Sequence, residues 1–230
     1  HDYRSGEVLL PAGTRLDAAA VGLLASAGIG SVPVNHRPRV GVLVTGDEVV
    51  SPGASPLPPG KIYDANQALL LSRLAELGFP DTVGARAGDS PEAAASAMGR
   101  LLETCDLVLT TGGVSVGAKD ILHQTLPLLG AEQVFWRVKL KPGSPALFSR
   151  YRGKPILSLS GNPFAAFTTF ELLARPLLAA LSGEPELLPE RRGAILDTPF
   201  PKGSPIRRFV RGRFVRGRYG DGHVSLPQGH

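Results

Sequence analysis

The stretch DLVLTTGGVSVGAKD, residues 106–120, decides the fold of this chain because it joins a strand, a turn and the start of a helix. Its first half is a continuous apolar run, which is typical of a strand covered on both faces. Gly112 and Gly113 follow directly and allow backbone N–H groups to converge on an anion, and the positive end of the next helix points there too. An ordinary connection between strand and helix also uses glycine, so both interpretations stand.

The same alternation of strand and helix continues on both sides of this stretch. Ser90 with Pro91 is suited to begin one helix, and Pro176 is expected to kink or divide the last one. The fold is therefore predicted to be α/β, with a three-layer, mostly parallel sheet, helices on both faces and a small C-terminal β domain. The predicted strands are 39–45, 81–87, 106–111 and 155–160, and the predicted helices are 65–78, 90–103, 119–130 and 163–183.

Three regions divide the 230 residues into 1–36, 37–183 and 184–230. The first holds a helical pattern at 17–27 and a short strand, SVPV, and is not expected to fold alone. The second holds the alternating strands and helices. The third has short strands and turns and is expected to be an incomplete β module.

Composition narrows the class of protein. The single Cys105 excludes an intramolecular disulfide and a multi-cysteine metal site. No apolar run is judged to approach the roughly 20 residues that span a bilayer, and no signal-like start is seen, so a cytoplasmic protein without a membrane partner is expected.

Basic charge gathers near the C-terminus. The net charge is +5, but residues from Leu187 onward hold nine Lys/Arg and three Asp/Glu, so the rest of the chain carries −1. The sequence RFVRG at 208–212 recurs at 213–217, with arginines and apolar residues interleaved. A strand with one solvated face is favoured, and a surface that binds an anion or nucleic acid is the alternative.

Ligands of open α/β sheets bind at the carboxyl ends of the strands, so the segments there are candidate sites. Besides the glycine stretch, these are VTGDE at 44–48, LKPGSPA at 140–146 and LSGNPF at 159–164. The glycine spacing fits neither the dinucleotide fingerprint nor the P-loop.

Acidic residues follow several of these strands: Asp47 and Glu48 are adjacent, and Asp64, Asp89 and Asp120 lie further along. Acids that converge beside a phosphate suit Mg²⁺, which bridges protein and polyphosphate. Helix capping explains Asp64 and Asp89 equally well. The adjacent acids repel each other unless a positive group compensates.

Basic groups alternate in WRVKLKPGSP, where Arg137, Lys139 and Lys141 are predicted to project from one face of an extended segment. Such a face suits an oxyanion, although a solvated edge strand is the alternative. Asn162 and Pro163 open a helix and either cap it or offer N–H donors to an anion. Together these sites favour metal-assisted chemistry at a phosphoanhydride or oxyanion.

Five motifs, TGDE, PGKIYDAN, TTGGVSVGAKD, KPGSP and SGNP, in this order, closely resemble the molybdopterin molybdenumtransferase family, which includes bacterial MoeA and the E domain of gephyrin. The likeness covers nearly the whole chain, including LLPAGTRL at its start. It implies insertion of molybdate into adenylylated molybdopterin, in a Mg²⁺-dependent step that releases AMP.

The resemblance also implies roles for residues. Glu48, Asp89, Asp120 and Lys141 are expected to be catalytic, and the three acids to hold the metal. Ser115 and the two glycines are expected to contact the pyrophosphate, and Arg137 and Lys141 to attract molybdate or phosphate. The substrate-binding set is Thr45, Gly46, Asp47, Asp64, Asn66, Thr111, Gly112, Gly113, Ser115, Arg137, Pro142, Gly143, Ser160, Gly161, Asn162 and Pro163.

Three residues depart from the family pattern: Arg137 replaces a frequent lysine, Ser144 a basic residue and Ser160 a proline. By the resemblance, 1–36 is a remnant of the N-terminal region, 37–183 the molybdopterin-binding domain and 184–230 a partial C-terminal domain. The resemblance also implies a homodimer, with the upstream adenylyltransferase as a further expected partner. The chain alone is expected to fold without turning over.

Two other functions share the same glycine-loop domain. One is molybdopterin adenylyltransferase or a related nucleotide-pyrophosphate hydrolase, which the flanking segments disfavour. The other is a non-catalytic scaffold of the gephyrin kind, which the retained acids Asp47, Glu48, Asp89 and Asp120 disfavour. Nucleic acid is the least favoured partner.

Overall fold

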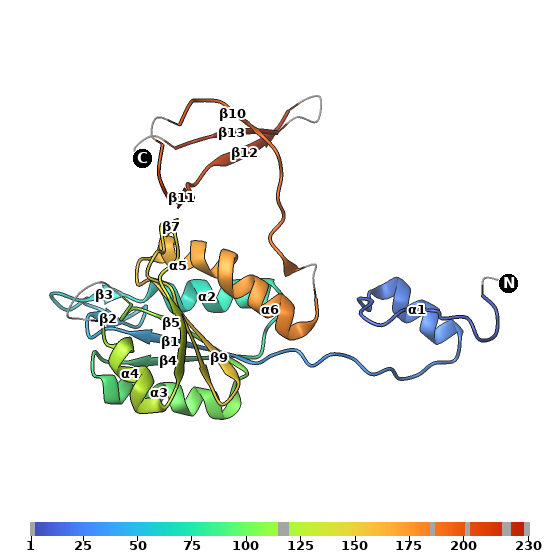
Figure 1. The fold of residues 1–230 in the computed structure, drawn as a ribbon, viewed down its shortest axis with the longest axis horizontal. Coiled ribbons are helices and arrows are strands. Elements are labelled where there is room, and N and C mark those ends of the chain that lie inside the picture. Colours follow the sequence, from blue (N-terminus) through green and yellow to red (C-terminus); the bar gives the residue numbers. More distant parts are fainter. Residues whose placement is uncertain (1–2, 115–119, 185–186, 201–202, 218–221, 228–230) are drawn as a thin grey trace.

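The computed structural model describes residues 3–114, 120–184, 187–200, 203–217 and 222–227. A six-stranded sheet forms its centre (Figure 1). Its strand order is β4-β1-β5-β9-β8-β6. Its first four strands are parallel, β8 runs antiparallel to β9, and β6 antiparallel to β8, so β6 runs in the direction of β9. The strands are β1 (Val40–Thr45), β4 (Thr82–Ala87), β5 (Leu107–Thr111), β6 (Glu132–Trp136), β8 (Leu147–Tyr151) and β9 (Lys154–Leu159).

Helices cover both faces of this sheet, which confirms the predicted three-layer α/β fold. Met98 and Leu122 pack with Leu43 and Val108 in one core, under α3 (Pro91–Thr104) and α4 (Leu122–Leu129). The core on the other face joins strand side chains to α2 (Ala65–Glu76), α5 (Pro163–Thr169) and α6 (Arg175–Ser182). Continuous apolar strands are buried between these two layers, as a parallel sheet requires.

Helix ends follow the predicted capping residues. The Ser90 hydroxyl accepts the N–H of Ala93 at 3.3 Å at the start of α3, with Pro91 in its first turn. Asp17 likewise caps α1 (Ala18–Ser26), which stands apart from the sheet in Figure 1 at the end of an extended segment. The predicted strand SVPV does not form, because residues 31–34 run along this segment without a neighbouring strand.

The long C-terminal helix is divided as Pro176 predicts. A π-helical turn, Phe170–Ala174, separates α5 from α6, and Pro176 stands in the first turn of α6. Proline lacks the N–H that would bond one turn back, so the irregular turn falls directly before it.

Residues Pro163–Ser182 form a helix of 20 residues with mean hydropathy 1.4, long and apolar enough by composition to cross a membrane. The expectation that no segment approaches this length is therefore wrong. Phe170, Ala174 and Leu178 of this helix are fully buried against the sheet. This packing is typical of a core helix, which passes the same test of length and hydropathy.

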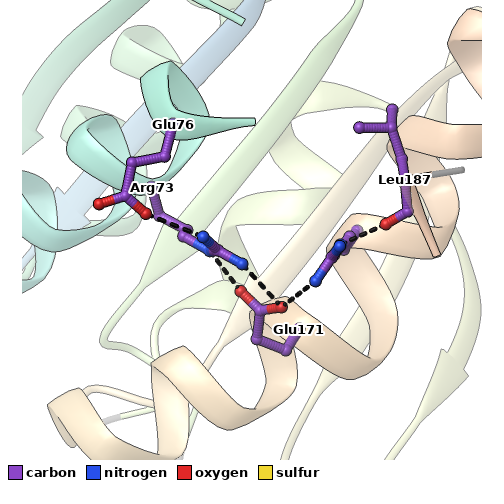
Figure 2. A network of polar contacts seen from close by, with 5 residues as sticks. Arg73, Glu76, Glu171 and Leu187 are labelled. Atoms are coloured by element: carbon purple, nitrogen blue, oxygen red, sulfur yellow. Dashed lines mark hydrogen bonds and ion pairs between the residues drawn. The ribbon is translucent and has the colours of Figure 1, made fainter. Parts of the chain in front are cut away.

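A network of ion pairs joins α2 to this divided helix (Figure 2). Arg73 donates to Glu171 at 2.6 Å and 3.3 Å, and Arg175 donates to the same carboxylate at 2.9 Å and to the carbonyl of Leu187. The three charged side chains are 17–24% exposed. Burial by itself raises the pKa of Glu171, but the hydrogen bonds from both arginines outweigh it and leave its pKa below the ordinary value.

Replacing Glu171 by glutamine is expected to lower the free energy of unfolding by about 2–3 kcal/mol at pH 7. Because the folded state lowers the pKa of this carboxyl, its contribution is complete above the ordinary value of about 4.3 and is lost as the pH falls. Urea unfolding of the parent and the variant between pH 7 and about pH 3 measures the difference in their free energies of unfolding, which should narrow as the pH falls below that value.

The matched control for Glu171 is Glu190→Gln, because Glu190 pairs with Arg192 at 2.7 Å on the exposed surface. Water and salt screen an exposed pair, so this variant should unfold almost as the parent does. A loss of equal size in both variants would contradict the role assigned to the network.

The C-terminal region forms short strands, as predicted. A three-stranded sheet consists of β10 (Ile195–Leu196), β13 (Gly222–Ser225) and β12 (Arg213–Arg216), in this order. All four residues of β12 are exposed. In addition, β11 (Arg207–Arg208) pairs with β7 (Leu140–Lys141), and β2 (Val49–Val50) pairs with β3 (Ile62–Tyr63). The boundaries at residues 36 and 183 stay predictions.

Candidate functional site

The carboxyl ends of β1, β5 and β9 meet at one edge of the sheet, as their parallel pairing requires. Gly112 has φ +86°, and a Cβ there would lie 2.5 Å from the carbonyl oxygen of Thr45. Thr45 in turn donates its hydroxyl to the carbonyl of Thr111 at 3.3 Å. Asn66 donates to the carbonyl of Gly161 at 2.8 Å. Five predicted substrate-binding residues are thus brought together.

The second glycine of the loop is also required by its surroundings. Gly113 has φ +63°, and a Cβ there would lie 2.8 Å from Cγ1 of Ile121. The following helix begins at Leu122, later than predicted. Ser115 lies outside the described residues, so its contact with pyrophosphate stays a prediction.

Two of the predicted acids bind each other's backbone. The N–H of Asp47 donates to the Asp89 carboxylate at 3.2 Å, and the N–H of Asp89 donates to the Asp47 carboxylate at 3.2 Å. Glu48 lies beside them, folded toward Gly46, where a Cβ would be 3.0 Å from its Oε2. These three acids are exposed at the ends of β1 and β4.

Lys61 lies next to the adjacent acids and binds the backbone there. Its Nζ donates to the carbonyl of Asp47 at 2.7 Å. The short pairing of β2 with β3 places it there, since the N–H of Ile62 donates to the carbonyl of Glu48 at 2.8 Å. Sequence reasoning missed Lys61, although it lies within the motif PGKIYDAN.

Asp64 has a structural role that sequence reasoning held as one alternative. Its side chain is 1% exposed, accepts the N–H of Gln67 at 2.9 Å at the start of α2 and pairs with Nε of Arg86 at 2.8 Å. Both carboxylate oxygens therefore bind protein groups. Contact of Asp64 with substrate stays a prediction.

No group of three or more His, Cys, Asp or Glu side chains in the described part of the chain is close enough to hold a metal. Asp120 stands on the α4 side, 9% exposed, with an oxygen 3.5 Å from Nε2 of His123. Mg²⁺ usually takes one or two carboxylates and completes its shell with water and substrate phosphates. The exposed pair Asp47 and Asp89 fits this open arrangement, and the predicted set Glu48, Asp89 and Asp120 stays a prediction.

The predicted basic face of 137–141 is not a continuous strand, which corrects the sequence interpretation. Strand β6 ends at Trp136, and Arg137 takes a left-handed backbone with φ +68°. The chain then closes on itself, since the N–H of Val138 donates to the carbonyl of Ser144 at 2.9 Å. Alternation requires extended backbone on every residue, so the turn interrupts it.

The KPG segment is fixed against α5. Gly143 has φ +93°, and a Cβ there would overlap the Cγ2 methyl of Thr169. Lys141 is exposed beside it. Pro142, also predicted to bind substrate, connects these two residues.

The C-terminal region brings two further arginines to this edge. Arg208 lies opposite Lys141 in the pairing of β11 with β7, and the N–H of Phe209 donates to the carbonyl of Lys141 at 2.8 Å. Arg211 lies over the ring of Phe164, 4.7 Å from its centroid. Sequence reasoning treated these arginines as part of a tail, although their repeated motif was visible.

Capping accounts for the polar residues at the start of α5. The side-chain Oδ1 of Asn162 accepts the N–H of Ala165 at 3.1 Å, and the hydroxyl of Ser160 accepts the N–H of Asn162 at 3.4 Å. Pro163 is in the first turn of the helix. An anion contact of these residues stays a prediction.

Comparison with known proteins agrees with this arrangement. Molybdopterin molybdenumtransferase of Bacillus subtilis is 35% identical over 212 residues, which cover 91% of this chain and 49% of that protein. Molybdopterin molybdenumtransferase 2 of Mycobacterium tuberculosis is 34% identical over 217 residues, with 91% and 53% covered. The chain thus spans about half the length of these relatives.

Comparison with solved structures leads to the same group of proteins as the sequence comparison. The crystal structure of the molybdopterin biosynthesis MoeA protein from Pyrococcus horikoshii superposes with a TM-score of 0.75 and 26% identity, covering 100% of this chain and 54% of that one. The family described as "Probable molybdopterin binding domain" matches residues 41–180, from β1 into α6. The chain therefore belongs to the family of probable molybdopterin binding domains.

Proposed function

We propose that this chain takes part in molybdenum cofactor biosynthesis by inserting molybdate into adenylylated molybdopterin, with Mg²⁺-dependent release of AMP. The observation that supports this proposal most is that acidic side chains lie on one side of the Gly112–Gly113 turn and basic side chains on the other. Asp47 and Asp89 lie at the end of β1 and β4, and Lys141 lies with Arg208 at the KPG segment. Acids suit a cation bound to phosphate, and basic groups suit an oxyanion.

The proposed roles follow this division. The backbone N–H groups around Gly112 and Gly113 orient the pyrophosphate, and Lys141 attracts molybdate. Asp89, with Glu48 and Asp120 as further candidates, holds Mg²⁺, which when bound would neutralise charge on the phosphates. The names of the Bacillus and Mycobacterium relatives support molybdate as the metal substrate.

Molybdate-dependent release of AMP tests the function. The protein that carries this chain is incubated with adenylylated molybdopterin and Mg²⁺, with and without molybdate, beside the Bacillus subtilis relative as a positive control. AMP release that requires molybdate is expected. Consumption of ATP with molybdopterin alone would favour the adenylyltransferase, and absence of both reactions would favour a scaffold.

The Lys141→Ala variant is expected to raise KM for molybdate by about 10-fold or more, because a hydrogen bond to a charged group contributes about 1.5–3 kcal/mol. The matched control is Lys139→Ala, an exposed lysine two residues away. Steady-state kinetics at varied molybdate measures both. Equal changes in the two variants would mean that the general positive charge, not Lys141, attracts molybdate.

Assembly and location belong to the same proposal. The family resemblance supports a cytoplasmic homodimer that receives its substrate from the upstream adenylyltransferase. Sedimentation of the protein at micromolar concentration, alone and with that enzyme, measures both associations. A monomer under all of these conditions would contradict the homodimer.

A further inference from the structure

An aromatic surface lies at the end of β6. Trp136, the last residue of this strand, is 37% exposed. The Cζ atom of Arg137 lies over its ring, 4.4 Å from the centroid. The ring of His123 meets the same indole edge-on, with centroids 4.4 Å apart and planes at 83°. One tryptophan thus has a guanidinium over its ring and a histidine against its edge.

This surface borders the proposed site. Trp136 pairs with Leu147, Leu147 with Ser158, and Ser158 with Thr110, so Trp136 is level with the residues that precede the glycine turn. Because β6 runs in the direction of β5 and β9, its end faces the same edge of the sheet. On the α4 side, Nε2 of His123 lies 3.5 Å from the carboxylate of Asp120.

The left-handed backbone of Arg137 builds the stack. In extended backbone, neighbouring side chains point to opposite faces, so the guanidinium would point away from the indole. At φ +68° it returns over the ring. The N–H of Arg137 donates to the carbonyl of Ala146 at 2.9 Å and keeps this conformation in place. Residues other than glycine rarely adopt it, and where they do, the strain often marks a functional position.

We propose that Trp136 and Arg137 form a binding subsite for a planar heteroaromatic ring of the substrate, either the purine or the pterin. A guanidinium is flat and stacks on aromatic faces, so the exposed side of Arg137 continues the surface that the indole begins. The inference rests on the proposed function. It gives Arg137 a ring to bind in addition to the oxyanion that its charge attracts.

Tryptophan fluorescence reads this subsite directly, because Trp136 is the sole tryptophan of the chain. The probes are AMP, ribose 5-phosphate, inorganic phosphate and pterin, with calorimetry for pterin because that ring fluoresces. Ribose 5-phosphate and inorganic phosphate should leave the emission unchanged. A change of emission with AMP identifies the purine, and binding of pterin that weakens in Arg137→Lys identifies the pterin. Failure of both rings overturns the proposal.

Arg137→Lys keeps the charge and removes the flat group. It should weaken binding of the stacked ring by about 10-fold and leave the affinity for inorganic phosphate unchanged. The matched control is Arg152→Lys, since Arg152 also has a left-handed backbone, φ +49°, and lies over the neighbouring Tyr151 ring at 5.1 Å. It lies at the turn between β8 and β9, so its replacement should leave ring binding unchanged.

The thermal unfolding of Arg137→Lys and Arg152→Lys should match that of the parent. The Trp136→Leu variant should weaken ring binding and leave the affinity for inorganic phosphate unchanged. If molybdate-dependent AMP release holds while Arg137→Lys and Trp136→Leu bind both rings as the parent does, the subsite is wrong and the proposed function stands. If AMP release fails while ring binding still depends on Arg137, the function is wrong and the subsite stands.

Discussion

Replacing Gly112 by alanine is expected to lower the free energy of unfolding by about 2–4 kcal/mol and to slow AMP release at least about 100-fold. Its φ of +86° disfavours any side chain. A Cβ would also lie 2.5 Å from the carbonyl oxygen of Thr45 and 2.8 Å from its hydroxyl. The carbonyl belongs to a central strand and cannot move away, so the loop has to shift from the position in which it would hold the pyrophosphate.

The Gly130→Ala variant separates the cost of the left-handed backbone from the cost of the contact with Thr45. Gly130 ends α4 with φ +75°, similar to Gly112, but nothing lies within 4 Å of a Cβ placed on it. This control should lose only about 1–2 kcal/mol, the conformational cost, and should keep its activity. Urea unfolding and AMP release measure both variants. Equal losses in the two would show that contact with Thr45 does not restrict the loop.

The strands and helices could be predicted largely because their signals are local. Buried parallel strands are continuous apolar runs, and β1, β5 and β9 all have this pattern. Ser90 and Asn162 stand at helix starts, where a short polar side chain satisfies a free N–H group. Four parallel strands then bring their ends to one edge, so the position of the candidate site followed from the fold.

The edge of the sheet beyond β9 could not be predicted in the same way. Strand β6 is exposed at most positions and has an irregular register between Gln133 and Phe135, so it lacks the apolar run that marks a buried strand. The left-handed turn at Arg137 has no glycine to signal it. Sequence reasoning therefore placed three basic residues on one face of a strand that in fact ends before them.

Contacts across long sequence separation were also missed. The pairing that sets Arg208 beside Lys141 joins residues 67 positions apart, and it depends on how the C-terminal strands return to the main sheet. No local pattern records such a return. The bond from Lys61 to Asp47 depends in the same way on the short pairing of β2 with β3.

The acids illustrate a further limit, because residue type and spacing do not give the partner of a side chain. Asp64 and Asp89 were equally suited to a metal and to a helix cap. The structure gives Asp64 a cap and a buried ion pair with Arg86, whereas Asp89 is exposed beside Asp47. Variants at Asp64 can therefore separate a structural role from a role toward substrate.

Asp64→Ala is expected to lower the free energy of unfolding by about 3 kcal/mol. Loss of the cap contributes about 1 kcal/mol, and loss of a fully buried carboxylate from its arginine contributes the rest. The guanidinium of Arg86 is 33% exposed, so water replaces part of the lost interaction and the effect stays at the lower end for a buried pair. Urea unfolding measures the change.

The Asp64→Asn variant separates the helix cap from the ion pair, because asparagine caps a helix as well as aspartate does but carries no charge. It should lose about 1–2 kcal/mol less than the alanine variant and keep its affinity for AMP. Ser90→Ala provides the reference for a cap alone, since the Ser90 hydroxyl accepts the N–H of Ala93 at 3.3 Å at the start of α3. If Asp64→Asn instead unfolds as the parent does and loses AMP binding, Asp64 contacts the substrate and its ion pair with Arg86 contributes little to stability.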